Sequence, residues 1–386
     1  MTELDTLEYV DSPDALNNWV DHLKGADLIA VDTESDSFHH YQEKVCLIQV
    51  TANGRDAVID PLALEDIQPL KEVFADPTRV KIFHDAGYDL LCLKRDFGFE
   101  FEGLFDTMWA SRLLGKRKFG LGAVLEERFG FMADKRYQRS NWAQRPLSDE
   151  QLHYARFDTH YLPELVGQLT AELQAMGRWE WALEDFARLP EQVGEPTGRK
   201  GEPDPDGFWR IKGLRGLNPT ELGRVRSLYL VRDHLAQRLD RPPFKVFGDH
   251  IIIGIATRPP SSMDDFAPRP GLRQSGLSRF GPDILRALKK ATPINHGPPP
   301  GAKRRRRTGR FQDPQVKDRY EALRVVRREL ASGLDLEPEV LMGNAAIESL
   351  ARKPPKSLEE LKGREALVGW RGPIMSETLY RCISGD

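Results

Sequence analysis

The sequence predicts an α/β domain with a mixed sheet flanked by helices, followed by two small all-helical domains. Apolar, β-branched segments in the first quarter of the chain predict strands, at 28–34, 45–51, 57–60 and 80–83. Segments with helical spacing come later in the same domain, near 64–75, 90–98, 107–114, 120–129 and 148–176. Strands that precede most of the helices favour a mixed sheet covered by helices. The length of 386 residues also exceeds that of one ordinary domain.

Two stretches rich in proline, glycine and charge interrupt the second half, at 190–207 and 294–310. Only helical apolar spacing follows each of them, as at 219–239 and from Tyr320 onward. We therefore predict an α/β domain at 1–195, helical domains at 207–292 and 313–386, and a basic linker at 293–312.

Charge is distributed unevenly along the chain. Residues 1–195 hold 20 Lys and Arg against 36 Asp and Glu, a formal charge of -16, whereas the remainder holds 36 against 23, a charge of +13. A basic half attracts polyanions directly, and an acidic half does so only where divalent cations neutralise part of it. The arrangement suits a metal-dependent nuclease with a separate gripping module, although plain solvated surfaces are the alternative.

The sequence also argues against several protein classes. The three cysteines Cys46, Cys92 and Cys382 form no CxxC pair and have no histidines at zinc spacing, which makes disulfides and structural zinc poor predictions. No run of about 18 uncharged apolar residues occurs, and the first ten residues carry acids rather than the lysines of a leader peptide. We expect a cytoplasmic protein without a membrane span.

Asp32 and Glu34 are the first candidate catalytic residues. They lie two residues apart at the end of an apolar strand, so their side chains point to one face of the sheet. Two adjacent carboxylates repel each other unless a cation lies between them, and hard oxygen ligands of this kind suit Mg²⁺ or Mn²⁺. A simple strand end that enters a loop is the alternative.

Two further acids follow predicted strands. Asp89 opens a helix after the fourth strand, where either a functional role or the helix dipole accounts for it. Asp106, before the helix near 107–114, is better explained as an N-cap.

Asp158 lies well inside a helix whose start is marked by Ser148 and Gln151, a capping box. An aspartate is a poor residue for a helix interior, so it needs a partner there. Tyr154 lies one turn earlier on the same face. A salt bridge from Asp158 to Arg156 or to another helix neighbour is the alternative to a catalytic role.

The four acids fall on strand ends and on one late helix, where they can converge at one edge of the sheet. Four carboxylates for two cations form the arrangement used for phosphodiester cleavage. One cation helps to deprotonate and position a water molecule, and the other stabilises the leaving 3′ oxygen.

At these motifs the chain resembles the DEDD exonuclease superfamily, and specifically ribonuclease D and the exonuclease subunit of the eukaryotic nuclear exosome. The motifs are VDTE at 31–34, HDAGYDL at 84–90 and YARFD at 154–158. The tyrosine four residues before the last aspartate is typical of the tyrosine subgroup. The segments 105–115 and 134–162 extend the similarity to nearly all of residues 25–175.

The resemblance implies a ribonuclease H-like fold and assigns roles to the acids. Asp32, Glu34 and Asp158 would bind one ion, Asp32 would also reach the second, and Asp89 would act directly or through water. Tyr154 would orient the attacking water. No carboxylate of the pattern is missing, which argues against a member that only binds its substrate.

The basic half resembles HRDC domains, the helical modules that follow the nuclease domain in ribonuclease D. One such module is expected near 207–292 and a second near 313–383. The residues expected to contact nucleic acid are mostly basic: His84, Arg224, Arg226, Arg232, Lys303, Arg304, Arg305, Arg306 and Arg307. Such contacts position phosphates and do not read base sequence. For the arginines at 224–232 and for the basic run at 303–307, the alternative is an ordinary solvated surface.

The predicted function is a 3′-5′ exoribonuclease that uses two divalent cations, Mg²⁺ or Mn²⁺, and releases nucleoside 5′-monophosphates from RNA. By analogy with ribonuclease D, transfer RNA precursors are the expected partners. A repair-type DNA exonuclease and a non-catalytic nucleic-acid adaptor are the alternatives. The Gly-Lys pair at 115–116 lacks a phosphate-loop context, so no helicase motor is expected beside the helical modules. No nucleotide cofactor is expected either.

Overall fold

The computed structural model describes residues 7–132, 134–194, 203–266, 274–299, 311 and 313–385. The chain forms two compact units. The first unit joins Met1–Ser35, Val45–Pro196 and Thr308–Asp386, and the second joins Asp36–Lys44 to Thr197–Arg307.

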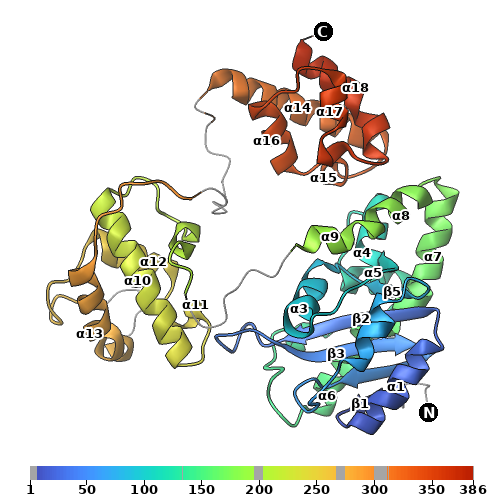
Figure 1. Cartoon of the computed structure of the whole chain (residues 1–386), viewed down its shortest axis with the longest axis horizontal. Coiled ribbons are helices and arrows are strands. Elements are labelled where there is room, and N and C mark those ends of the chain that lie inside the picture. The colour runs from blue at the N-terminus through green and yellow to red at the C-terminus, as the bar shows by residue number, and fades with distance from the viewer. Residues whose placement is uncertain are drawn as a thin grey trace. The chain divides into compact units, whose positions relative to one another are not determined.

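In the described residues six strands form one mixed sheet in the first unit (Figure 1). Its order is β1 (Leu7–Val10), β4 (Arg55–Ile59), β3 (Val45–Ala52), β2 (Leu28–Ser35), β5 (Val80–Phe83) and β6 (Leu104–Asp106). β3 is antiparallel to both of its neighbours, and the other pairs are parallel. The predicted mixed sheet is therefore confirmed.

Helices cover both faces of the sheet because the residues of β2 alternate between two apolar cores. Ile29 and Val31 pack with helices α1 (Pro13–Lys24), α2 (Pro69–Ala75) and α3 (Gly87–Phe97). Ala30 packs on the other face with α4 (Thr107–Leu113) and α7 (Leu162–Ala175). On that second face α6 (Asp149–His160) contributes Ala155 to a cluster with Leu47 of β3. α5 (Leu121–Phe129) adds Val124 to the core of α4 and α7.

The first unit also holds a helical domain near the end of the chain. Its helices are α14 (Pro314–Gly333), α15 (Pro338–Leu341), α16 (Asn344–Arg352), α17 (Leu358–Lys362) and α18 (Arg371–Ser384). Arg371 pairs with the buried Asp185 of α8 (Trp179–Ala187), with 2.6 Å between Nη1 and Oδ1. Trp370 stacks on Trp181 with ring centroids 4.3 Å apart. One continuous apolar core therefore runs through both domains of this unit.

The second unit is built around α10 (Pro219–Arg238), α11 (Pro243–Val246), α12 (Asp249–Thr257) and α13 (Gln274–Lys290). The loop 36–44 belongs to it through two contacts with Asp240. His40 Nδ1 lies 2.7 Å from Asp240 Oδ2, and the backbone amide of Tyr41 donates to Oδ1 at 3.1 Å.

Several predicted boundaries needed correction. The helix predicted at 148–176 is two helices, because Pro163 has no amide hydrogen for the carbonyl of Thr159. The helix predicted at 64–75 begins only at Pro69, which suits a first helical position. β1, β6, α1, α8 and the short helix α9 (Leu189–Val193) were not predicted. Among the described residues, no helix has the length and apolarity needed to cross a membrane.

Candidate active site

Asp32 and Glu34 lie near the end of β2, where its alternation points them to the face that α6 covers. Leu47, Gln49 and Thr51 of β3 stand opposite Glu34, Asp32 and Ala30 on the same face. The strand register shifts between Glu34 and Ser35, so regular pairing ends directly after the two acids.

Asp89 approaches β2 from the other face, in the first turn of α3. The hydroxyl of Thr33, which lies between Asp32 and Glu34 in sequence, donates to Asp89 Oδ1 at 2.5 Å. The turn before α3 is held by Asp106, which accepts hydrogen bonds from the amides of Ala86 at 2.9 Å and Trp109 at 2.9 Å. The predicted N-cap role of Asp106 is confirmed.

Asp158 and Tyr154 are carried by α6, whose predicted capping box is present. Ser148 Oγ accepts from the Gln151 amide at 3.3 Å, and the Gln151 side chain accepts from the Ser148 amide at 3.0 Å. The alternative salt bridge from Asp158 to Arg156 is not the one that forms, because Arg156 pairs with Asp56 at 2.6 Å.

Asp56 of β4 anchors α6 to the sheet. Its carboxylate accepts from Arg156 Nε at 2.6 Å and from the Thr51 hydroxyl at 2.7 Å, and it lies 2.8 Å from His160 Nδ1. Burial by itself raises the pKa of Asp56, but the hydrogen bonds from His160 and Thr51, together with the charges of His160 and Arg156, hold the pKa below its usual value. The rotation of α6, and with it the direction of Asp158, is therefore set by a buried ionic network.

Tyr154 is held by aromatic neighbours from the loop before α6. Its ring stacks on the buried Trp142, with centroids 6.0 Å apart, and lies 6.2 Å from the ring of Tyr137. Arg145 fixes this loop by donating to the Trp142 carbonyl at 2.6 Å and to Asp60 Oδ1 at 2.7 Å.

Burial and the charges of neighbouring carboxylates raise the pKa values of Asp32, Glu34 and Asp158. Burial, followed by the charges of Asp89, Asp158 and Glu34, raises the pKa of Asp32 well above its usual range. Burial and then Asp158 do the same to the pKa of Glu34. Burial raises the pKa of Asp89 to about 7 against an opposing hydrogen bond from Thr33, and burial with Asp89 raises the pKa of Asp158 to about 7. Burial and Asp158 also raise the pKa of Tyr154.

These carboxylates match a divalent cation in ligand chemistry, because all four supply hard oxygen atoms. No three His, Cys, Asp or Glu side chains in the part of the chain that the structure describes are gathered tightly enough to enclose a metal ion. Carboxylates that share a site with little water repel one another, which opposes closer approach. In the described residues the four carboxylates therefore supply suitable ligand atoms but do not yet enclose a cation.

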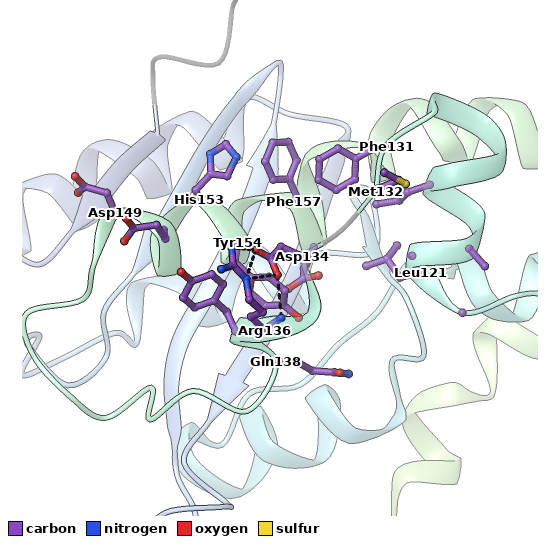
Figure 2. Close-up of a pocket in the computed structure, with 17 residues that line it drawn as sticks. Leu121, Phe131, Met132, Asp134, Arg136, Gln138, Asp149, His153, Tyr154 and Phe157 are labelled. Atoms are coloured by element: carbon purple, nitrogen blue, oxygen red, sulfur yellow. Dashed lines mark hydrogen bonds and ion pairs between the residues drawn. The ribbon is translucent and has the colours of Figure 1, made fainter.

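A pocket of about 840 Å³ borders Tyr154 and Asp158. Figure 2 shows His153, Phe157 and Phe131 along one wall of it. The Phe157 ring lies 4.3 Å from Phe131 and 4.7 Å from His153, centroid to centroid. The remaining lining residues are apolar or acidic for the most part: Gly120, Leu121, Gly122, Ala123, Leu125, Met132, Asp134, Arg136, Tyr137, Gln138, Asp149 and Glu150.

His84 is poorly placed for the predicted contact with nucleic acid. The Thr107 hydroxyl donates its only proton to the Phe83 carbonyl at 3.0 Å. Toward His84 Nδ1, which lies 2.9 Å away, Thr107 Oγ1 can therefore only accept, and Nδ1 is the donor. Burial lowers the pKa of His84 to about 4, which leaves the ring neutral at physiological pH. A neutral, half-buried ring offers no charge to a phosphate.

The predicted arginines of α10 differ in their surroundings. Arg232 is buried and donates to the Phe247 carbonyl at 3.2 Å and to Asp249 Oδ1 at 2.8 Å, so its guanidinium is committed to the fold and the prediction for it is wrong. Arg224 and Arg226 are half-buried. Arg224 reaches the Ala256 carbonyl at 3.2 Å. The basic run at 303–307 lies outside the described residues.

A groove of about 320 Å³ between α10 and α13 was not predicted. Four of its lining residues can carry positive charge, and one is acidic: His234, Arg238, Arg286, Lys290 and Asp283. Arg238 and Arg286 are mostly exposed. The i, i+4 spacing of His234 with Arg238 and of Arg286 with Lys290 was visible in the sequence. The packing of α10 against α13 was not.

Comparisons with known proteins agree with the geometry. Residues 7–174 match a family model described as 3′-5′ exonuclease, and residues 221–288 and 316–371 match the HRDC domain. Ribonuclease D from Shewanella sp. is 30% identical over 98% of this chain and 94% of its own length. The exosome complex exonuclease RRP6 of Saccharomyces cerevisiae is 32% identical over 66% of this chain. The matched region covers only 36% of the length of RRP6. The crystal structure of Escherichia coli RNase D has the same fold, with a TM-score of 0.74, 24% identity and coverage of 98% of this chain and 99% of that one.

Proposed function

This chain belongs to the ribonuclease D family of 3′-5′ exoribonucleases, and from that premise we propose a two-cation mechanism for it. Asp32, Glu34, Asp89 and Asp158 would hold two divalent cations, and water would cleave the terminal phosphodiester at the 3′ end of RNA, releasing a nucleoside 5′-monophosphate. The proposal is supported most by the convergence of these acids: Asp32 and Glu34 share one face of β2, and Thr33 between them donates to Asp89. Accordingly, burial and the charges of Asp89 and Asp158 raise the pKa values of Asp32 and Glu34.

Exonucleases of this family use divalent metal ions in general, and Mg²⁺ or Mn²⁺ suits an all-oxygen ligand set. When bound, the two cations would activate a water molecule for in-line attack and stabilise the leaving 3′ oxygen. The carboxylates must lose their protons to act as ligands. Burial raises the pKa values of Asp89 and Asp158 to about 7 in the absence of metal, so both residues would have to release a proton to bind a cation near neutral pH.

Tyr154 orients the attacking water by hydrogen bonding. Burial and the charge of Asp158 raise the pKa of its phenol, so the hydroxyl stays protonated at neutral pH and does not serve as the base. Stacking on Trp142 limits the directions in which the hydroxyl points.

The pocket beside Tyr154 and Asp158 receives the 3′ end of the RNA. Its apolar wall of Phe131 and Phe157 suits the faces of nucleobases, whereas the acidic residues Asp149 and Glu150 do not suit phosphates. Base stacking tolerates any sequence, which fits an enzyme that removes successive nucleotides. Structured RNA ends, including those of transfer RNA precursors, are the proposed substrates, and the cytoplasm remains the predicted location.

The second unit grips the RNA backbone through exposed cations. Arg238, Arg286 and Lys290 line its groove. Arg224, Arg226 and the basic run at 303–307, all predicted from the sequence, are further candidates for contact with phosphates. Removing everything after residue 195 would be a poor test of this grip, because residues 308–386 share an apolar core with the nuclease domain. Charge reversal within the groove avoids that problem.

Substrate choice is tested with matched RNA and DNA oligonucleotides of one sequence, labelled at the 5′ end and incubated with Mg²⁺ or Mn²⁺. We expect shortening of the RNA from its 3′ end and slower loss of the DNA. Equal or faster digestion of DNA would favour a repair-type DNA exonuclease. Binding of either strand without any cleavage would favour an adaptor.

A further inference from the structure

Gln49 is a buried side chain that the proposed chemistry does not yet use. It lies in the middle of β3 and is 0% exposed. Within the described residues, neither its Nε2 nor its Oε1 atom has a hydrogen-bond partner. A buried amide without a partner costs roughly 1–3 kcal/mol, so a native protein that keeps one calls for an explanation.

The register of the sheet places Gln49 directly opposite Asp32. Residues paired in this way on antiparallel strands share a face, with Cβ atoms about 4.5–5.5 Å apart. The Asp32 carboxylate takes a hydrogen bond from the backbone of Thr33, and no side chain among the described residues donates to it. A donor without an acceptor therefore faces a carboxylate with few donors.

Asp89 offers a parallel within the same cluster. The hydroxyl of Thr33 donates to its Oδ1 atom at 2.5 Å. Asp89 is thus oriented by a side chain of β2, whereas Asp32 has no side-chain donor of this kind in the part of the chain that the structure describes. A residue that hydrogen-bonds to a metal ligand fixes the direction of that ligand. Removing such a residue typically lowers metal affinity or activity by about 10–100-fold.

We propose that Gln49 is a positioning residue of the carboxylate site, whose amide Nε2 donates to the Asp32 carboxylate when the site takes up a divalent cation. The inference rests on the proposed function. Donation to Asp32 would give the buried Nε2 an acceptor and would leave the other carboxylate oxygen of Asp32 for the cation.

The test replaces Gln49 with methionine, which has a similar length and volume but no donor. Mg²⁺ alone is titrated against the thermal midpoint of the protein, and separately against the rate of shortening of a 5′-labelled RNA. We expect the half-saturating Mg²⁺ concentration of Gln49→Met to rise about 10–100-fold in both measurements. The midpoint without Mg²⁺ should stay unchanged or rise, because the amide has no partner to lose.

The matched control is Gln168→Met, which makes the same change at an α7 glutamine whose Nε2 lies 3.5 Å from Glu164 Oε1. Its Mg²⁺ requirement should equal that of the wild type. An unchanged Mg²⁺ requirement in Gln49→Met overturns the positioning role and leaves the proposed function intact. A wild-type enzyme that cleaves RNA in the absence of any divalent cation overturns the proposed function itself.

If Gln49→Met does not fold, the wild-type protein decides the question. The side-chain amide protons of Gln49, observed by NMR, should shift downfield as Mg²⁺ is added, while those of Gln168 stay in place. Amide signals of Gln49 that do not respond to Mg²⁺ would contradict the proposal.

Discussion

The anchor of α6 offers a prediction whose magnitude comes from the structure. Asp56 and Arg156 form an ion pair at 2.6 Å, and their side chains are 2% and 4% exposed. Asp56→Asn keeps the shape of the side chain and removes its charge, which leaves the buried Arg156 cation beside a neutral amide. Breaking a buried pair in this way costs about 3–5 kcal/mol. For a domain of 150–250 residues that corresponds to a fall of about 6–20 °C in the thermal midpoint.

The control is Glu377→Gln, which removes a carboxylate from the exposed pair with Arg381, where the side chains are 72% and 71% exposed. An exposed pair contributes less than about 1 kcal/mol. Thermal unfolding by circular dichroism at pH 7 compares the two variants, and hydrogen exchange of the α6 amides reports where the loss occurs. Adding Arg156→Met to Asp56→Asn should restore part of the stability, because a buried ion pair can be replaced by apolar residues at little cost.

RNA cleavage by Asp56→Asn should fall along with stability, because Tyr154 and Asp158 both depend on the rotation of α6. A midpoint for Asp56→Asn within 1–2 °C of the Glu377→Gln control would refute this reasoning, and so would equal exchange rates in α6.

Three further outcomes follow from the same structure. Tyr154→Phe should lower the cleavage rate by roughly 10²-fold with little change in RNA affinity, as measured by single-turnover kinetics and fluorescence anisotropy; an unaltered rate would remove Tyr154 from the chemistry. In the absence of metal, Asp89 and Asp158 bind protons more tightly in the folded than in the unfolded protein, because their pKa values are raised to about 7. The free energy of unfolding should therefore decrease as pH rises from about 4 to about 7, and Mg²⁺ should reverse the loss at the upper end; urea titrations that show rising stability over this range would contradict the assignment. The double variant Arg286→Glu, Lys290→Glu should weaken RNA binding. The slope of log affinity against log salt concentration should become shallower by about 0.7 for each phosphate that the groove no longer binds. An affinity equal to that of the wild type at every salt concentration would exclude the groove as a binding site.

The strands and motifs were predictable because they depend on local pattern. The apolar runs of β2, β3 and β5 were found nearly to the residue, and the capping box of α6 fixed the phase that puts Tyr154 and Asp158 on one face. Short edge strands such as β1 and β6 carry too few residues for a periodic signal. The break between α6 and α7 was signalled by Pro163, which the helical pattern around it outweighed.

The partners of the charged residues could not be predicted, since they depend on interactions between distant parts of the chain. Arg156 pairs with Asp56, 100 residues earlier, rather than with its helix neighbour Asp158. Arg232 has the spacing of an exposed cation but is buried and donates to Asp249 at the start of α12. Gln49 did leave a signal, as an amide in the middle of an otherwise apolar strand, but its meaning depends on the register that pairs it with Asp32.

We propose that the carboxylate cluster, with divalent cations, cleaves RNA from the 3′ end. This proposal is tested most directly by following a 3′-terminal labelled nucleotide on RNA with the wild type and with Asp158→Asn, each in Mg²⁺ and in EDTA. We predict that the wild type releases the label first and as a nucleoside 5′-monophosphate in Mg²⁺ only, whereas Asp158→Asn binds the RNA and releases none. Release at a wild-type rate by Asp158→Asn, or by the wild type in EDTA, would contradict the account.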